Sequence, residues 1–125
     1  MKELTKAEEQ IMQILWRIER GVVKDILKDF SDPKPAYNTV STIVRILEKK
    51  EFVSHKAYGK THEYFPLVSK KEYTKVFFNG VMKNYFSDSY SSLASFLTDN
   101  KSISVKDMEE IKILMEEEIE KQKNS

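Results

Sequence analysis

A run of polar side chains between residues 36 and 50 offers the clearest chemistry in this sequence. Its amide, hydroxyl, ammonium and guanidinium groups all form hydrogen bonds, and they recur at helical spacing. We call this set the polar face, and it consists of Tyr37, Asn38, Thr39, Ser41, Thr42, Arg45 and Lys49. Val40, Ile43, Val44 and Leu47 repeat on the opposite side of the same predicted helix. The spacing therefore predicts a helix with one face for a hydrogen-bonding partner and one face for a core.

Basic and aromatic side chains follow that helix. Two β-prone runs, 52–58 and 61–67, flank a Gly-Lys pair that predicts a tight hairpin turn. Lys56, Tyr58 and Lys60 then lie near one exposed tip. Although the whole chain has a net charge of only +1, residues 34–62 carry six Lys or Arg against two Asp or Glu. The positive charge is therefore concentrated where it could meet phosphate groups.

Three short helices and the hairpin must position these residues. Thr5 and Glu8 match a capping box that opens a first helix, and Gly21 is expected to end it. Residues 22–30 form a short second helix by their periodicity, and residues 36–50 form the third. Three helices followed by a hairpin are typical of the winged helix-turn-helix, whose third helix enters the major groove of DNA. The sequence therefore predicts a protein that binds double-stranded DNA.

The polar face contains side chains suited to each kind of base contact. Arg45 is the strongest candidate for guanine, Asn38 can make paired hydrogen bonds to adenine, and the methyl group of Thr42 could meet that of thymine. Ile46 borders this face and must touch DNA methyl groups or a neighbouring helix. Lys56 and its neighbours in the hairpin suit phosphate or minor-groove contact. Which base each residue reads stays open at this point.

The second half of the chain is expected to be helical and to pair with another copy. A second capping box at 69–72 and a capping Ser104 open helical patterns whose apolar faces exceed what one small domain can cover. The dimerisation residues are predicted to be Tyr73, Val76, Phe77, Val81, Phe86, Leu93, Phe96, Leu97, Met108, Ile111, Met115 and Ile119. The expected fold is mainly α with a small β-hairpin: a winged-helix DNA-binding domain over 1–70 and a helical dimerisation domain over 71–125.

Several stretches resemble one known family, the penicillinase repressors of BlaI and MecI type. They are Leu4–Glu8, Ile14–Trp16, Pro35–Thr42, Leu47–Lys50 and Tyr64–Ser69, and the resemblance covers nearly the whole chain. The resemblance implies an N-terminal winged helix, a C-terminal dimerisation domain, a palindromic operator and repression by blocking transcription. It thus implies a double-stranded DNA operator and a second copy of the chain as partners.

The same resemblance suggests a regulatory protease as a further partner. In the β-lactam-responsive branch, repressors are inactivated by cleavage between Asn and Phe in the dimerisation domain. The similar place here is Ser95–Phe96, where serine stands instead of asparagine. Copper-responsive relatives carry clustered cysteines, and this chain has none, which excludes copper sensing by thiolates.

Composition argues against several other functions. Without cysteine, thiolate metal sites and cysteine nucleophiles are excluded, and His55 and His62 are interpreted as polar surface residues, so no metal site or cofactor is predicted. No catalytic motif is present, so we do not expect an enzyme. No segment approaches the roughly 20 apolar residues that cross a bilayer, and the start of the chain lacks a signal-peptide pattern. The expected location is the cytoplasm.

One alternative function fits the same predicted fold. A winged-helix module can serve protein–protein interaction, because a fold by itself does not determine function. The polar face alone could also be an ordinary solvated helix surface. The basic hairpin at the expected position and the family resemblance favour DNA.

Overall fold

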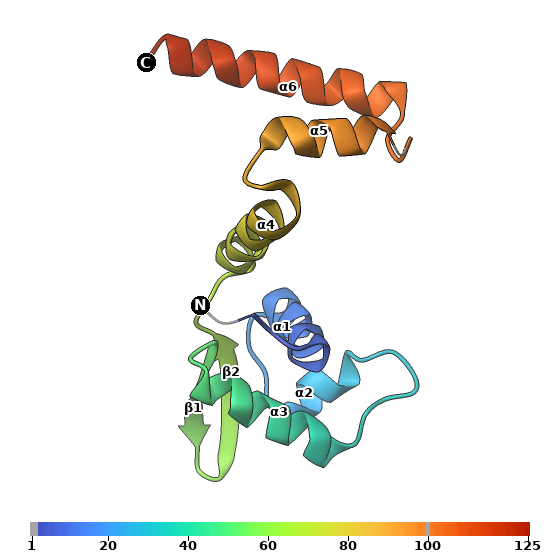
Figure 1. Ribbon diagram of the computed structural model, residues 1–125. Helices are drawn as coiled ribbons and strands as arrows, with labels where there is room; N and C mark the ends of the chain where they lie inside the picture. The colour runs from blue at the N-terminus through green and yellow to red at the C-terminus, as the bar shows by residue number, and fades with distance from the viewer. Residues whose placement is uncertain (1–2, 100) are drawn as a thin grey trace. The chain divides into compact units, whose positions relative to one another are not determined.

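The computed structural model describes residues 3–99 and 101–125, which divide into two compact units, Met1–Phe78 and Asn79–Ser125. The fold is mainly helical with one two-stranded antiparallel hairpin, as Figure 1 shows. This confirms the predicted fold class. None of the described helices is both long and apolar enough to cross a membrane.

Three helices open the first unit: α1 (Lys6–Ile18), α2 (Val23–Lys28) and α3 (Tyr37–Lys49). The capping box of α1 is confirmed, because the Thr5 hydroxyl accepts from the Glu8 amide at 3.2 Å and the Glu8 carboxylate accepts from the Thr5 amide at 2.9 Å. The expected stop at Gly21 is wrong by two residues. Glu19 ends the helix by adopting a φ of 72°, and its amide donates to the Leu15 carbonyl.

The hairpin, which we call the wing, consists of β1 (Val53–Tyr58), β2 (Thr61–Pro66) and the turn between them. Tyr58 pairs with Thr61, and Gly59 in the turn has a φ of 66°, which glycine adopts at little steric cost. The base of the wing is also joined to the segment after α1. Gly21 and Tyr64 exchange two backbone hydrogen bonds of 2.8 and 2.9 Å. The wing is therefore fixed at its base and free at its tip.

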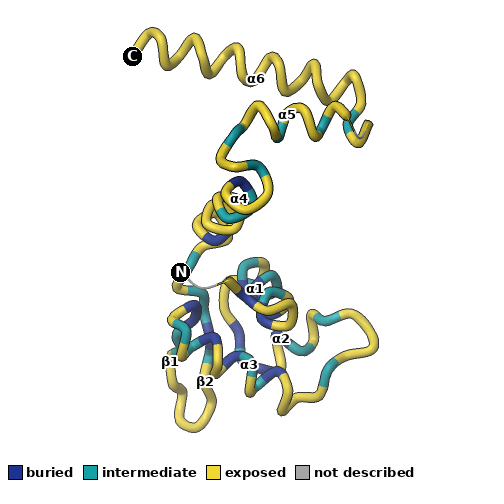
Figure 2. Tube along the Cα trace, in the orientation of Figure 1, coloured by how far each residue is buried: buried dark blue, intermediate teal, exposed yellow. Residues whose placement is uncertain are grey.

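A single apolar core lies between the three helices and the base of the wing, and Figure 2 shows its buried residues inside the first unit. Val40, Val44 and Leu47 of α3 are at most 1% exposed and face this core, with Ile43 at its edge. This confirms the predicted apolar side of the third helix. The other fully enclosed residues are Ile11, Met12, Leu15, Ile26, Phe52 and Val53.

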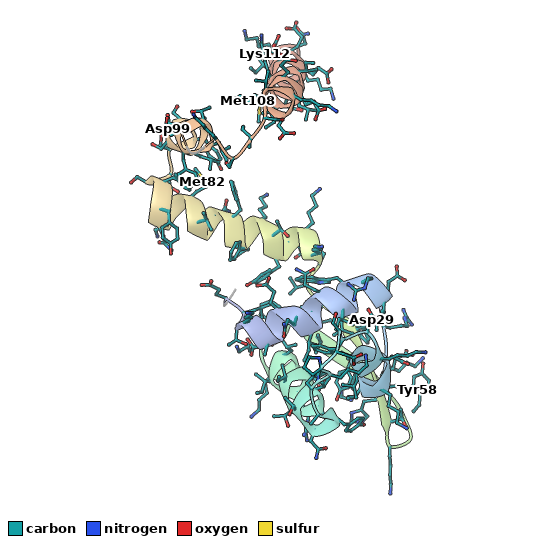
Figure 3. The ribbon with its side chains drawn as sticks, turned by 90° about the vertical axis from the view of Figure 1, so that its right-hand side faces the viewer. Asp29, Tyr58, Met82, Asp99, Met108 and Lys112 are labelled. Carbon is teal, nitrogen blue, oxygen red and sulfur yellow. The ribbon has the colours of Figure 1, made fainter. Side chains whose placement is uncertain are left out.

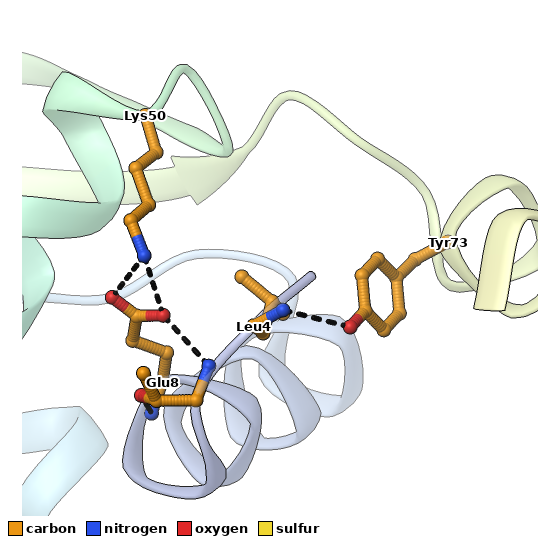
Figure 4. Close-up of polar contacts among 5 residues, drawn as sticks. Leu4, Glu8, Lys50 and Tyr73 are labelled. Carbon is orange, nitrogen blue, oxygen red and sulfur yellow. Dashed lines mark hydrogen bonds and ion pairs between the residues drawn. The ribbon is translucent and has the colours of Figure 1, made fainter. Parts of the chain in front are cut away.

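A nearly buried ion pair connects the start of α1 to the end of α3. The Lys50 ammonium lies 2.8 Å from both carboxylate oxygens of Glu8, whose side chain is 6% exposed (Figure 4). Burial raises the pKa of the Glu8 carboxyl, but Lys50 and the Thr5 amide together outweigh it and leave the pKa below its ordinary value. Glu8 is therefore charged at neutral pH and matched by Lys50.

Tyr73 belongs to the core of the first unit, although its spacing suggested a dimerisation role. It is 5% exposed, and its hydroxyl accepts a hydrogen bond from the Leu4 amide at 3.0 Å (Figure 4). Its ring contacts those of Trp16 and Phe52, with centroids about 6 Å away. The Trp16 indole donates to the Val68 carbonyl at 2.8 Å. Tyr73 therefore has no surface left for a second copy of the chain.

The remaining helices are α4 (Lys70–Phe86), α5 (Tyr90–Asp99) and α6 (Val105–Lys123). The predicted caps are confirmed at both α4 and α6, where Ser69 and Ser104 accept the amides of Glu72 and Asp107 at 3.0 and 3.1 Å. The first compact unit extends to residue 78, within α4. α4 ends where Ser87 takes a positive φ of 50°.

Replacing Glu8 with Gln is expected to lower the free energy of unfolding at pH 7 by about 2–4 kcal/mol, because Lys50 would keep a partly buried charge without its partner. A pKa lowered by folding stabilises the fold above the ordinary value of 4.5, and this contribution disappears as the pH falls through the folded-state value. The variant should therefore lose less stability than the wild type between pH 5 and strongly acidic conditions. Urea denaturation followed by the fluorescence of Trp16, the single tryptophan, measures both effects.

Glu9→Gln provides the matched control, since it removes the same charge one residue later, where no ion pair is formed among the described residues. Equal stabilities of the Glu8 and Glu9 variants would contradict the importance of the ion pair.

Candidate nucleic-acid interface

The polar face of α3 is exposed along three turns. Tyr37 is 48% exposed, Asn38, Thr39, Thr42, Arg45 and Lys49 are also exposed, and only Ser41 is half-buried. Ala36, the cap residue of α3, offers no side chain to the amides of the first turn. Those amides can therefore donate to a partner, and the helix dipole favours an anionic one.

A cleft between α3 and the wing brings part of the polar face together with the wing turn. This helix–wing cleft holds about 270 Å³. Its polar walls come from Tyr37, Ser41 and Arg45 of α3 and from Lys60 of the turn, all of which the sequence analysis selected. Its remaining wall consists of Val22, Val23, Thr61, His62 and Tyr64, which the sequence analysis did not select. The contribution of Thr61, His62 and Tyr64 depends on strand register and could have been found only from the correct pairing of the hairpin, whereas Val22 and Val23 lie at the start of α2.

A second hollow, of about 620 Å³, lies along α3 and is lined by Thr42, Arg45, Ile46, Glu48 and Lys49. Ile46 is 40% exposed there, so it is not covered by a neighbouring helix of the described chain. Arg45 borders both this hollow and the helix–wing cleft. Among the described residues, the Arg45 side chain makes one long hydrogen bond, 3.4 Å to the Ser41 carbonyl, so most of its guanidinium remains available to a partner.

Every residue of the wing tip from 56 to 62 is exposed. Tyr58 is 53% exposed and lies at the end of the hairpin (Figure 3). The Lys56 ammonium sits 5.3 Å from the centre of its ring, within the range of a cation–π contact. Neither residue lines the two hollows, and neither do Asn38 and Thr39. The selected residues thus form one neighbourhood around Arg45 and outlying groups at the wing tip and the start of α3.

Two basic residues of the positive segment are already bonded within the chain. Lys50 is paired with Glu8, and the Lys34 ammonium donates to the backbone carbonyls of Lys28 and Phe30. These two residues therefore stabilise the fold. The cations left for a partner are Arg45, Lys49, Lys56 and Lys60, which are all exposed.

The two histidines of the wing form a contact that their spacing did not predict. The rings of His55 and His62 stack with centroids 4.0 Å apart and planes 8° apart. His55 is also hydrogen-bonded to the carboxylate of Glu48 on α3. Within 3–99 and 101–125, no group of three or more His, Cys, Asp or Glu side chains could hold a metal ion. The histidines therefore connect the wing to α3.

Most of the side chains selected for dimerisation are accessible. Seven of them are exposed: Val76, Phe77, Phe96, Met108, Ile111, Met115 and Ile119. Four others are half-buried: Val81, Phe86, Leu93 and Leu97. No residue of α6 is buried, and its Val105, Ile113 and Leu114 are exposed as well, although the sequence analysis did not select them. The Ser95–Phe96 bond lies inside α5, with the Phe96 ring against that of Phe86 at 5.6 Å.

Comparisons with known proteins support these observations. The Methicillin resistance regulatory proteins MecI of Staphylococcus aureus (strain N315) and Staphylococcus epidermidis are each 25% identical to this chain over 118 residues, covering 90% of it and 93% of the relative. The solution structure of the DNA binding domain of the repressor BlaI superposes with a TM-score of 0.50 and 23% identity, covering 58% of this chain and 94% of that one. That likeness supports the winged-helix fold.

The family model described as Penicillinase repressor matches residues 4–117, almost the whole chain. Members of that family are transcriptional repressors and not enzymes, in agreement with the absence of a catalytic motif from the sequence. The match confirms the resemblance seen in the sequence, and the chain belongs to the penicillinase repressor family.

Proposed function

We propose that this DNA-binding repressor acts as a homodimer on a palindromic operator, with each α3 in the major groove of one half-site and each wing on the flanking phosphates. The observation that supports this most is the position of Arg45. It lies at the centre of an exposed polar face, borders both hollows and has the basic wing beside it. An arginine in this setting can reach a guanine edge while neighbouring side chains hold the backbone.

The other base contacts follow from the exposure of the polar face. Asn38 in the first turn can pair with adenine, and the exposed methyl groups of Thr42 and Ile46 suit thymine. The phosphates are then contacted by the remaining selected residues, Lys49, Lys56, Tyr58 and Lys60. Such contacts strengthen binding to any sequence and do not distinguish one base from another.

The second helical segment supports the homodimer. α6 has 19 residues and buries none of them, although it carries apolar side chains along much of its length. Large exposed apolar surfaces mark interaction sites, and two-fold pairing of identical chains is the commonest way to cover them. A two-fold dimer also matches a palindrome, whose half-sites lie about 34 Å apart or at a multiple of that distance. We therefore assign the α6 surface to a second copy.

A protease acting at Ser95–Phe96 would inactivate such a repressor by separating α6 from the DNA-binding unit. Proteases bind extended chains, so α5 would first have to unwind around this bond. α5 buries none of its residues, which makes local unwinding inexpensive. This helix is thus accessible to a regulatory protease, and serine replaces asparagine at the bond.

Arg45→Ala is expected to weaken binding to the preferred duplex by about 1–3 kcal/mol and to relax the choice of base at one position of each half-site. Lys60→Ala should instead weaken all duplexes alike and reduce the slope of log affinity against log salt concentration by about one per chain. Selection of bound duplexes from a random pool, followed by fluorescence anisotropy at several salt concentrations, measures both.

Lys121→Ala is the control, because it removes a positive charge from α6 and leaves the polar face intact. Equal losses on preferred and random duplexes for Arg45→Ala would remove its role as a base reader. If the wild type enriches no palindrome from the pool, the winged-helix unit serves protein interaction instead.

Met115→Glu is expected to shift the protein from dimer to monomer, because it places a charge among the exposed apolar side chains of α6. Equilibrium sedimentation should give twice the 14.7 kDa chain mass for the wild type at micromolar concentration and the single mass for the variant. Gln122→Glu adds the same charge to a polar position of the helix and should leave the dimer intact. A wild type that sediments as a monomer would contradict the dimer.

A further inference from the structure

The helix–wing cleft carries more hydrogen-bond donors than the reading of base edges requires. Tyr37, Ser41, Arg45, Lys60 and Thr61 border it, and each of them can donate. Two of the five are cations. Among the residues that the structure describes, no carboxylate lines the cleft. A space with donors, positive charge and no acidic wall is suited to an oxyanion.

Tyr64 adds a donor that has no partner within the chain. The residue is 4% exposed, and its backbone is held by Gly21, but its hydroxyl makes no hydrogen bond to any residue in 3–99 or 101–125. Buried tyrosine hydroxyls usually find a partner. In the same part of the chain, no fully occluded side-chain oxygen or nitrogen is unpaired, so this hydroxyl must be open to solvent. The space that Tyr64 borders is the cleft.

The hydroxyl of Tyr64 is protonated at neutral pH and can therefore donate a hydrogen bond. Burial raises the pKa of Tyr64 above its ordinary value of 10.0, and the nearby carboxylate of Glu48 raises it further, whereas Arg45 lowers it. The phenol therefore keeps its proton and offers it as a hydrogen-bond donor. A ligand with exposed acceptor oxygens satisfies it.

We propose that the helix–wing cleft holds one phosphate group of the DNA backbone, which accepts hydrogen bonds from the hydroxyls of Tyr64 and Ser41 and is neutralised by Lys60. This proposal rests on the proposed function. It adds Tyr64, a buried residue of β2, to the side chains that contact DNA. Because α3 contributes one wall and the wing the other, the phosphate sets the depth of the helix in the groove relative to the wing.

Two observations favour a backbone phosphate over a free phosphorylated molecule. The cleft shares Arg45 with the hollow that runs along the polar face, so a strand read by that face passes beside the cleft. The cleft is also small, since its volume of about 270 Å³ lies below the roughly 300–1,000 Å³ that is usual for small-molecule sites.

Tyr64→Phe tests the proposal, since it removes one oxygen and keeps the ring in the core. In the full chain, affinity for the preferred duplex and for a scrambled duplex of equal length should fall alike, on the order of tenfold, as for a lost hydrogen bond to a charged acceptor. Tyr85→Phe is the control, because it removes the same atom from a residue that is 78% exposed on α4. Thermal unfolding followed by Trp16 fluorescence checks that both variants fold. If Tyr64→Phe does not fold, Ser41→Ala removes the second proposed donor and takes its place.

Inorganic phosphate separates the two sources of the ligand. In an NMR titration of the protein without DNA, phosphate should shift the amide signals of Ser41 and of residues 60–64, and the preferred duplex should displace it. One outcome is that phosphate shifts the wild-type signals but Tyr64→Phe binds both duplexes as tightly as the wild type. That result would assign the cleft to a free phosphorylated ligand and overturn the proposed DNA contact. If Tyr64→Phe loses affinity only for the preferred duplex, the hydroxyl contacts a base, and the proposed phosphate contact is overturned. A wild type that binds no duplex would instead overturn the proposed function.

Discussion

The ion pair between Glu8 and Lys50 is the interaction on which the geometry of the first unit depends. It joins residues 42 positions apart, one in the first turn of α1 and the other at the C-terminal cap of α3. Immediately after Lys50, Glu51 takes a φ of 66° and Phe52 donates to the Leu47 carbonyl at 3.0 Å, so the chain turns sharply into β1. The ion pair thus lies at the point where α3 ends and the wing begins.

Local signals in the sequence were sufficient for most of the elements. Thr5 with Glu8 and Ser104 with Asp107 cap helices as their spacing indicates, and the apolar period of α3 identifies the side that packs in the core. These features are set by neighbours within one or two turns, which a sequence displays directly. The same is true of the hairpin, whose Gly59 adopts the positive φ that a tight turn needs.

Features that depend on distant partners could not be predicted in this way. Glu8 both caps its helix and pairs with Lys50, and the second role is visible only when α3 is placed beside α1. Tyr73 has the helical spacing of a dimerisation residue, but its contacts with Leu4 and Trp16 place it in the core of the first unit. Periodicity shows which side of a helix is apolar and not what covers that side. In a single chain, every residue of α6 is exposed, including those on its apolar side.

The two glycines associated with the wing differ in how much change they permit. A side chain at Gly21 would come within 2.9 Å of both Asp25 and Ile18, so the strand-like contact at the base of the wing requires glycine there. A Cβ at Gly59 would meet no atom within 4 Å among the described residues, so its positive φ is what favours glycine there. Mutation and insertion can therefore accumulate at the tip without disturbing the base. Packing within the domain therefore restricts the base of the wing, whereas the fold restricts the tip only through its turn geometry.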